Sequence, residues 1–352
     1  MRKRLDAIIV GGGQAGLALG RELALRGKDF LILEAGRRIG DAWRHRWDSL
    51  TLFTPARYSA LPGLAFPAEP DHHPTAREMA AYLESYARAF ELPVALDEPV
   101  RELRRADGSR FIVTTDHARY IARQVVVATG PFQAPALPAA AALLPPGVRQ
   151  LHSSEYRNSA ELEAGPVLVV GGGNSGVQIA AEVARSHETM LAVGTRLRRL
   201  PRRLFGRSVF EWLDRVGAMS IPVESALGRR ASRTDVLIGD SPRSIARRLG
   251  VRLLERVVGV CGSALALAGG TTVAPRTVIW ATGFRPDYPW LRVPTLDARG
   301  LPEHRQGVSQ VAGLYFLGLP WLRSRGSALV GWVGRDAAYL AGQMETQLAR
   351  AA

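Results

Sequence analysis

The sequence predicts an α/β protein with two Rossmann-like domains, because one strand–turn–helix–strand pattern occurs twice. The first copy carries the turn Gly11-Gly-Gly13-Gln-Ala-Gly16 after an apolar run, and the second carries Gly171-Gly-Gly173-Asn-Ser-Gly176 in the same setting. Two further apolar runs end in Ala-Thr-Gly, at residues 128–130 and 281–283. These turns between apolar strands and helices are typical of doubly wound nucleotide-binding folds.

The glycines of each turn have separate roles in such a fold. The first permits the tight bend, the second lets the backbone approach a pyrophosphate, and the third lets the helix pack on the strand. The pyrophosphate then lies at the helix N-terminus. We therefore expect nucleotide contacts from two sets of residues: Gly11, Gly13, Gln14, Ala15 and Gly16, and Gly171, Gly173, Asn174, Ser175 and Gly176.

The residues that follow the two patterns differ in charge. Glu34 lies 23 residues after Gly11, where a carboxylate can accept hydrogen bonds from a ribose diol. Thr195 and Arg196 end the second pattern, and Arg196 lies 25 residues after Gly171, where a cation would bind a 2′-phosphate. The first site is therefore predicted to hold an unphosphorylated dinucleotide and the second to hold NADPH.

Composition excludes several classes of protein. The 352 residues are 47% apolar and carry a formal net charge of +14. Lys3 and Lys28 are the two lysines, so arginine supplies nearly all of the positive charge. This bias is typical of a high-G+C genome, so the net charge does not indicate a surface selected for phosphate binding, and we do not expect nucleic-acid binding. The arginines are densest at residues 196–207, where they would attract an anionic cofactor.

Cysteine usage and hydropathy narrow the choice further. Cys261 is the single cysteine, which excludes an intramolecular disulfide and dithiol chemistry, and we expect it to be buried. Cysteine and histidine spacing predicts no metal site. The basic start resembles a signal peptide, but its apolar run is short and leads directly into Gly11. We expect a cytoplasmic protein without a membrane span. The sequence is compatible with a homodimer and does not decide the oligomeric state.

The two Ala-Thr-Gly turns predict where the chain passes between the domains. The first domain would comprise residues 1–155 and 276–352, and the second, residues 156–275, would be inserted into it. Residues 131–146 are expected to form a linker and residues 198–248 to form a basic helical elaboration. The access path to the site is expected between residues 67–74 and 205–221.

With these motifs, Gly40-Asp-Ala-Trp43 and His152-Ser-Ser-Glu-Tyr156, the chain resembles the flavin-containing monooxygenase superfamily over nearly its whole length. It is most similar to short bacterial flavoprotein oxidoreductases and more distantly to plant auxin-biosynthesis monooxygenases. The resemblance implies a glutathione-reductase-type arrangement with FAD in the first site and NADPH in the second. FAD contacts are then expected from Trp43, Thr129, Gly130 and Asp287, although Asp287 is equally consistent with a surface turn.

The resemblance also implies a reaction. NADPH would reduce the flavin, O2 would add to give a flavin C4a-(hydro)peroxide, and one oxygen atom would pass to a small, soft nucleophile. The cofactor supplies this chemistry, and the protein positions the partners. The substrate itself is not predicted.

The chain departs from the family pattern at two places. Its domain-linking signature lacks the leading aromatic residue, but His152, Ser153 and Tyr156 match the core; we favour a structural role over proton transfer and expect them beside NADPH. Where many relatives carry an asparagine facing the flavin, this chain has Thr54, a weak catalytic candidate with one donor. Peroxide leakage is therefore expected.

Two other functions fit the same motifs. An FAD-dependent NADPH reductase or oxidase would pass electrons to a carrier or to O2 without oxygenating a substrate. A non-catalytic redox sensor would bind FAD and NADPH without bleaching of the flavin. The gain of one oxygen atom by a substrate would distinguish the monooxygenase from both.

Overall fold

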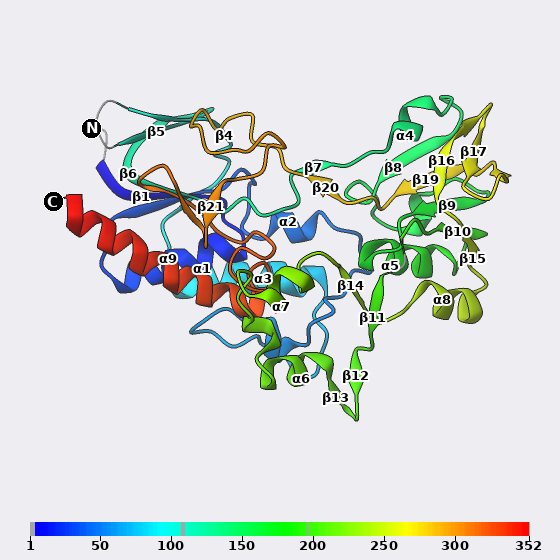
Figure 1. Cartoon of the computed structure of the whole chain (residues 1–352), viewed down its shortest axis with the longest axis horizontal. Helices are drawn as coiled ribbons and strands as arrows, with labels where there is room; N and C mark the ends of the chain where they lie inside the picture. The colour runs from blue at the N-terminus through cyan, green and yellow to red at the C-terminus, as the bar shows by residue number, and fades with distance from the viewer. Residues whose placement is uncertain (1–3, 107–109, 196, 352) are drawn as a thin grey trace.

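Two sheets at opposite ends of the molecule form its framework (Figure 1). The structure is a computed structural model that describes residues 4–106, 110–195 and 197–351. Helices cover both sheets, so the predicted α/β class is confirmed.

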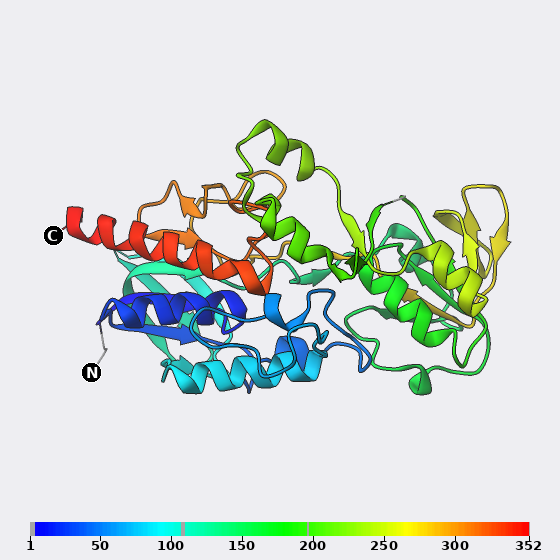
Figure 2. The same cartoon turned by 90° about the horizontal axis from the view of Figure 1, so that it is seen from below.

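The larger sheet has nine strands within the described residues and is mainly parallel at its centre. Its order is β21-β22-β23-β6-β1-β2-β3, and β5 pairs antiparallel with β4 and β6. Helix α1 packs against α9 and α3, and Figure 2 shows these helices on one side of the sheet. The bounds are β1 Arg4–Val10, β2 Phe30–Leu33, β3 Val94–Ala95, β4 Val100–Arg105, β5 Phe111–Thr115, β6 Arg119–Val127, β21 His304–Arg305, β22 Val308–Ser309, β23 Leu314–Phe316, α1 Gln14–Leu25, α3 Ala76–Ala89 and α9 Val330–Ala351.

The smaller sheet has the order β15-β10-β9-β19-β8, and its described strands are all parallel. Helix α5 lies against β9 and β10, and α8 packs beside it. Apolar side chains of α4 and of a three-stranded antiparallel sheet pack with the smaller sheet. The bounds are β8 Arg149–His152, β9 Val167–Val170, β10 Thr189–Ala192, β15 Arg252–Leu254, β19 Thr277–Trp280, β16 Val257–Cys261, β17 Ala264–Leu267, β18 Thr272–Val273, α4 Ala139–Leu143, α5 Asn174–Val183 and α8 Pro242–Leu249.

Two short strands join the sheets. β7 (Ala134–Pro135) pairs antiparallel with β20 (Phe284–Arg285) between the two ends of the molecule (Figure 1). The strands β8 and β19 belong to the smaller sheet, although the boundaries predicted at residues 155 and 276 assign them to the first domain.

Residues 198–240, called the inserted segment below, leave the smaller sheet after β10, extend toward the larger sheet and return to the smaller sheet before α8 (Figures 1 and 2). We expected this region to be helical, but strand pairs flank its short helices. Its Phe210 packs with Phe53, Tyr58 and Trp332 in an aromatic cluster. The bounds are β11 Arg198–Leu200, β12 Arg203–Leu204, β13 Arg207–Ser208, α6 Val209–Arg215, α7 Ala226–Ala231 and β14 Val236–Ile238.

The structure also bears on three expectations from the sequence, which concern membrane-spanning helices, metal sites and the single cysteine. None of the described helices is long and apolar enough to cross a membrane. The described residues contain no group of three or more His, Cys, Asp or Glu side chains placed to hold a metal ion. Cys261, which we expected to be buried, is exposed at the end of β16; the prediction was wrong because this strand lies in the outer three-stranded sheet.

Candidate functional site

The first glycine turn connects β1 to α1 and has no room for side chains at two positions. Gly11 has φ +110°, and a Cβ there would lie 2.7 Å from the carbonyl oxygen of Ala128. A Cβ on Gly16 would lie 1.9 Å from the carbonyl oxygen of Gly11. At Gly13, by contrast, no atom lies within 4 Å of the Cβ position. The turn therefore packs tightly against the sheet and leaves open space beside the N-terminus of α1.

Glu34 follows β2 and lies against this turn. Its Oε2 accepts a hydrogen bond from the N–H of Gly12 at 2.6 Å, and its Oε1 accepts one from Gly36 at 2.8 Å. A carboxylate has about four lone-pair sites, so it can still accept from a diol while it holds both amides. The residues around the turn therefore fit the ribose and pyrophosphate of a dinucleotide.

The other predicted residues of this turn have structural contacts. Gln14 begins α1, and Ala15 is buried against Gly318 of the turn after β23. Trp43 lies in the short helix α2 (Asp41–Arg44) and is half-buried against the main core. The open space at Gly13 therefore lies beside α1, which packs against the turn after β23.

The second turn, between β9 and α5, repeats the geometry of the first. Gly171 has φ +128°, and its Cβ would lie 2.2 Å from the carbonyl oxygen of Ala281. A Cβ on Gly176 would lie 1.9 Å from the carbonyl oxygen of Gly171, whereas the Cβ position of Gly173 is open. Each Ala-Thr-Gly turn thus supplies the backbone against which one glycine turn packs.

The second turn has no acid in the position of Glu34. A Cβ on Gly12 would meet Glu34, and a Cβ on Gly172 would meet Cγ1 of Val193 at 2.8 Å. Val193 is apolar and half-buried, so it cannot bind a ribose diol. The two turns therefore differ in chemistry where their geometry is alike.

A cation that sequence reasoning missed lies at the end of β10. Nη2 of Arg256 donates to Oγ1 of Thr195 and to the carbonyl oxygen of Gly194, both at 3.3 Å. The predicted Arg196 lies outside the described residues. Arg256 is brought here by the parallel pairing of β10 with β15, which the sequence between them does not reveal. Thr195 and Arg256 can together contact a phosphate group on a ribose.

Two residues at the start of α5 were predicted to contact a nucleotide. Ser175 lies in the first turn of the helix. Oδ1 of Asn174 accepts a hydrogen bond from the N–H of Ile238 at 3.0 Å, so this side chain also attaches β14 to α5. Asn174 further lines a cavity of about 410 Å³ with Thr51, Gln178 and Asp240.

The first Ala-Thr-Gly turn is tied to the crossing strands through Gln133. The Gln133 amide donates to Oγ1 of Thr129 at 2.9 Å and to the carbonyl oxygen of Gly130 at 3.0 Å. Its Oε1 accepts from the N–H of Asp287 at 2.5 Å. The Asp287 side chain is half-exposed and has Arg285 at 3.9 Å. The contacts of Asp287 therefore match the surface-turn alternative better than a flavin contact.

His152 stabilises the joint between the sheets. Its Nε2 donates to the carbonyl oxygen of Gly283 at 2.9 Å, and its Nδ1 lies 2.8 Å from the hydroxyl of Ser154. The ring also packs edge-on against Phe284. Burial lowers the pKa of His152, which keeps the ring neutral. Because both nitrogens have protein partners, the contacts favour the structural role.

The two other residues of the linking signature are buried beside it. The N–H of Ser153 donates to the carbonyl oxygen of Trp280 at 2.9 Å, which extends the contact between β8 and β19. Burial and the nearby carboxylate of Glu182 raise the pKa of Tyr156. The Ser153 contact is thus made by the backbone, and the Tyr156 hydroxyl is buried without a hydrogen-bond partner among the described residues.

Thr54 is buried, and its hydroxyl has a protein partner. Its Oγ1 lies 2.8 Å from Oγ of Ser59, which in turn lies 3.0 Å from the carbonyl oxygen of Pro55 and 3.2 Å from that of Thr54. Since a carbonyl only accepts, the serine proton is best used on these oxygens. The threonine proton is then directed to Ser59.

Comparison with known proteins places the chain among flavoenzymes. Residues 8–200 match the model of the pyridine nucleotide-disulphide oxidoreductase family. An uncharacterized CzcO-like oxidoreductase of Geobacillus kaustophilus is 44% identical, over 97% of this chain and 98% of the relative. The probable indole-3-pyruvate monooxygenase YUCCA1 of Arabidopsis thaliana is 29% identical, over 81% of this chain and 77% of its own.

A solved structure agrees with these relatives. The flavin-containing monooxygenase from Stenotrophomonas maltophilia superposes with a TM-score of 0.83 at 29% identity, covering 98% of this chain and 99% of that one. The predicted fold of two Rossmann-type domains and the resemblance to flavin monooxygenases are thereby confirmed. The chain is an oxidoreductase and belongs to the pyridine nucleotide-disulphide oxidoreductase family.

Proposed function

We propose that this oxidoreductase is an NADPH-dependent FAD monooxygenase that transfers one oxygen atom from O2 to a small, soft-nucleophile substrate. The observation that carries the proposal is the contrast between two turns of equal geometry. Gly13 and Gly173 each face open space at a helix N-terminus, but Glu34 accompanies one turn and Val193 the other. This contrast supports an unphosphorylated dinucleotide in one site and NADPH in the other, and the Stenotrophomonas and Arabidopsis monooxygenases support the reaction.

Each part of the first site has a separate task. The open amides at the N-terminus of α1 bind the FAD pyrophosphate, and Glu34 binds its ribose. Bound FAD supplies hydride acceptance from NADPH and the activation of O2 for transfer of one oxygen atom. Thr129 and Gly130 lie in the Ala-Thr-Gly turn beside this site, and the hydrogen bonds from Gln133 hold both residues in position.

In the second site, the N-terminus of α5 binds the NADPH pyrophosphate. Thr195 and Arg256 bind the 2′-phosphate together with Arg196, and the guanidinium groups contribute charged hydrogen bonds. His152 keeps the joint between the sheets fixed while both cofactors are bound. We further propose that the domains meet at β7 and β20, with β8 and β19 in the NADPH domain.

The proposal is tested by the fate of oxygen. Purified protein loaded with FAD is given NADPH, O2 and a panel of sulfides, amines and 2-oxo acids, and products are identified by mass spectrometry with ¹⁸O2. One labelled oxygen atom in an organic product, with matching NADPH consumption, supports the monooxygenase. NADPH consumption without labelled product across the panel contradicts it.

A second candidate is an NADPH oxidase, and the contact between Thr54 and Ser59 favours it. Because the Thr54 proton is directed to Ser59, Thr54 would offer no O–H donor to FAD bound beside it, where many relatives carry an asparagine amide. An oxidase releases H2O2 in a ratio near one to NADPH, whatever substrate is present.

A further inference from the structure

A β-hairpin of the inserted segment projects from the side of the molecule (Figure 1). Strands β12 and β13 pair Arg203 with Ser208 and Leu204 with Arg207, and the turn between them has two residues, Phe205 and Gly206. The projecting end carries the apolar side chains of Leu204 and Phe205, which are 41% and 85% exposed. Such an exposed pair at the tip of a hairpin has no role in the folded core.

The turn places phenylalanine where the backbone disfavours it. Phe205 has φ +48° and Gly206 has φ +74°, so both residues are left-handed, as in a two-residue type I′ turn. That turn prefers Asn-Gly or Asp-Gly, because a large side chain is strained at positive φ. Phe205 is therefore exposed to solvent and has a backbone conformation that disfavours a large side chain. Because neither feature stabilises the fold, we infer that the ring has a function.

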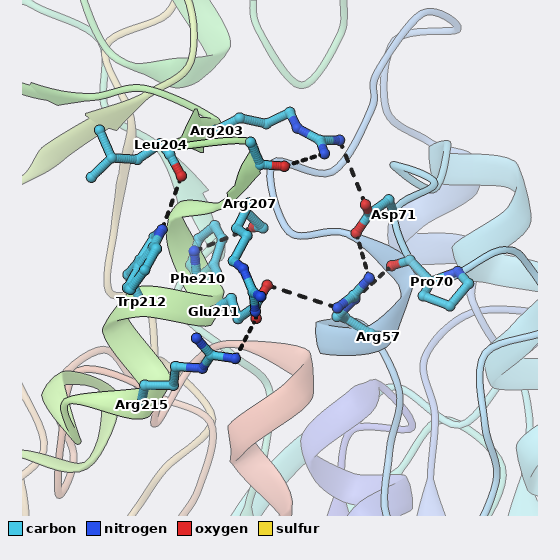
Figure 3. Close-up of polar contacts among 12 residues, drawn as sticks. Arg57, Pro70, Asp71, Arg203, Leu204, Arg207, Phe210, Glu211, Trp212 and Arg215 are labelled. Carbon is cyan, nitrogen blue, oxygen red and sulfur yellow. Dashed lines mark hydrogen bonds and ion pairs between the residues drawn. The ribbon is translucent and has the colours of Figure 1, made fainter.

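Neighbouring residues hold this tip in place. Nε1 of Trp212 on α6 donates to the carbonyl oxygen of Leu204 at 2.9 Å (Figure 3). The Trp212 ring also packs edge-on against Phe205, with 6.4 Å between the ring centroids. Asp71 of the first domain lies 3.5 Å from Arg203 and 2.6 Å from Arg57 (Figure 3). The tip is therefore attached to both α6 and the first domain.

Positive charge surrounds the apolar tip. Residues 198–215 contain six arginines against Glu211 and Asp214, a net charge of +4. The side chains of Arg203, Arg207 and Arg215 are 57%, 50% and 53% exposed even though they contact carboxylates. An apolar tip with an aromatic pair, flanked by Arg203 and Arg207, matches the interface of an anionic bilayer, where aromatic rings lie at headgroup depth and arginines meet phosphates.

We propose that this hairpin docks the enzyme on a lipid bilayer that carries anionic headgroups, with Leu204, Phe205 and Trp212 inserted among them. The size of the tip favours a bilayer over a protein, since a specific protein interface needs about 800 Å² on each partner. A bilayer needs only a few apolar side chains and nearby cations, each of which adds to the affinity. The inference does not depend on the reaction that the enzyme catalyses.

The test is co-sedimentation of the full-length, FAD-loaded protein with vesicles of phosphatidylcholine, with and without phosphatidylglycerol. Binding is expected to the anionic vesicles alone and should weaken as salt rises from about 0.05 M to about 0.5 M, because the Debye length shortens. Phe205→Asn should weaken binding roughly tenfold or more through loss of the inserted ring. The same change should keep or raise the Tm, because asparagine suits the left-handed turn.

Matched controls separate the hairpin from general surface effects. Leu143→Asn removes a 64% exposed side chain from α4 and should leave vesicle binding unchanged. Replacing Arg229 and Arg230 of α7 by glutamine removes two exposed charges away from the tip and should cost less binding than the same change at Arg203 and Arg207. The proposal is overturned by equal loss in the control variants or by no binding to anionic vesicles. Phe205-dependent self-association without lipid would assign the tip to a second copy and would also overturn it.

Discussion

The N–H of Gly12 donates a hydrogen bond of 2.6 Å to Oε2 of Glu34, so the first glycine turn holds the carboxylate that follows β2. Oε1 accepts from Gly36 at 2.8 Å, which fixes the second oxygen. In the second turn the corresponding neighbour is Val193, which makes no such bond. The carboxylate is therefore set in position before any ligand binds.

Glu34→Gln should weaken FAD binding strongly. The amide of glutamine has one oxygen and one NH2 group, so it cannot accept from both Gly12 and Gly36 and also receive a ribose diol. Loss of charged hydrogen bonds predicts roughly tenfold to a hundredfold weaker binding. Flavin fluorescence titration of the apoprotein measures this. Glu22→Gln on α1, away from the turn, is the control, and an equal affinity for both variants would contradict the assignment.

Gly13→Ala and Gly16→Ala should fail in different ways. A methyl group at Gly13 meets no protein atom, so the apoprotein should keep its Tm while FAD affinity falls, because the new side chain occupies the space for the pyrophosphate. A methyl group at Gly16 would lie 1.9 Å from a backbone oxygen, so that variant should lose stability by several kcal/mol. Calorimetry with and without FAD separates the two effects. A Gly13 variant with full FAD affinity would show that the open space is not the cofactor site.

Arg256→Ala should reduce the preference for NADPH over NADH. A guanidinium bonded to a phosphate contributes about 1.5–3 kcal/mol, so the KM for NADPH should rise roughly tenfold to a hundredfold while that for NADH stays unchanged. Arg196→Ala should act in the same direction, and stopped-flow reduction of the flavin measures both. Arg252→Ala, at the exposed start of β15, the strand that precedes Arg256, is the matched control. An equal loss with both nicotinamides would remove Arg256 from the phosphate site.

The sequence predicted what is encoded locally and missed what depends on distant pairing. The turns at Gly11 and Gly171 and the position of Glu34 follow from short-range spacing, and the fold class follows from them. Arg256 reaches Thr195 only because β15 pairs with β10 across some sixty intervening residues. Helical structure was expected at Phe205, where a two-residue turn instead closes a hairpin; a phenylalanine in that position gives no turn signal.

Stability should fall as the pH falls below about 6.5, and His152 should account for part of the loss. Burial lowers the pKa of His152, His73 and His304, so the unfolded chain binds protons that the folded chain does not. Thermal unfolding between about pH 7.5 and about pH 5.5 isolates these groups from most carboxylates. His152→Gln should flatten the slope of Tm against pH, since glutamine can still donate to Gly283 and does not titrate. An unchanged slope would show that His152 stays protonated in the fold or is not a main contributor.

Thr54→Asn should lower the release of H2O2 per NADPH consumed, and Thr54→Val should not change it. In the present structure the threonine proton is directed to Ser59, so the hydroxyl offers little to an oxygen species on the flavin. Asparagine can donate one N–H of its amide to Ser59 and still present the second N–H. A donor aimed at a developing oxyanion is worth about 2.7–4 kcal/mol, so even part of that effect would lengthen the life of the oxygenated flavin about tenfold.

Valine removes the buried hydroxyl and should cost about 0.5–1.5 kcal/mol of stability through the lost bond to Ser59. Peroxide assays and rapid mixing of reduced enzyme with O2 measure the first effect, and calorimetry measures the second. If valine raises H2O2 release as much as asparagine lowers it, the Thr54 hydroxyl itself faces the flavin and its contact with Ser59 does not persist in the loaded enzyme.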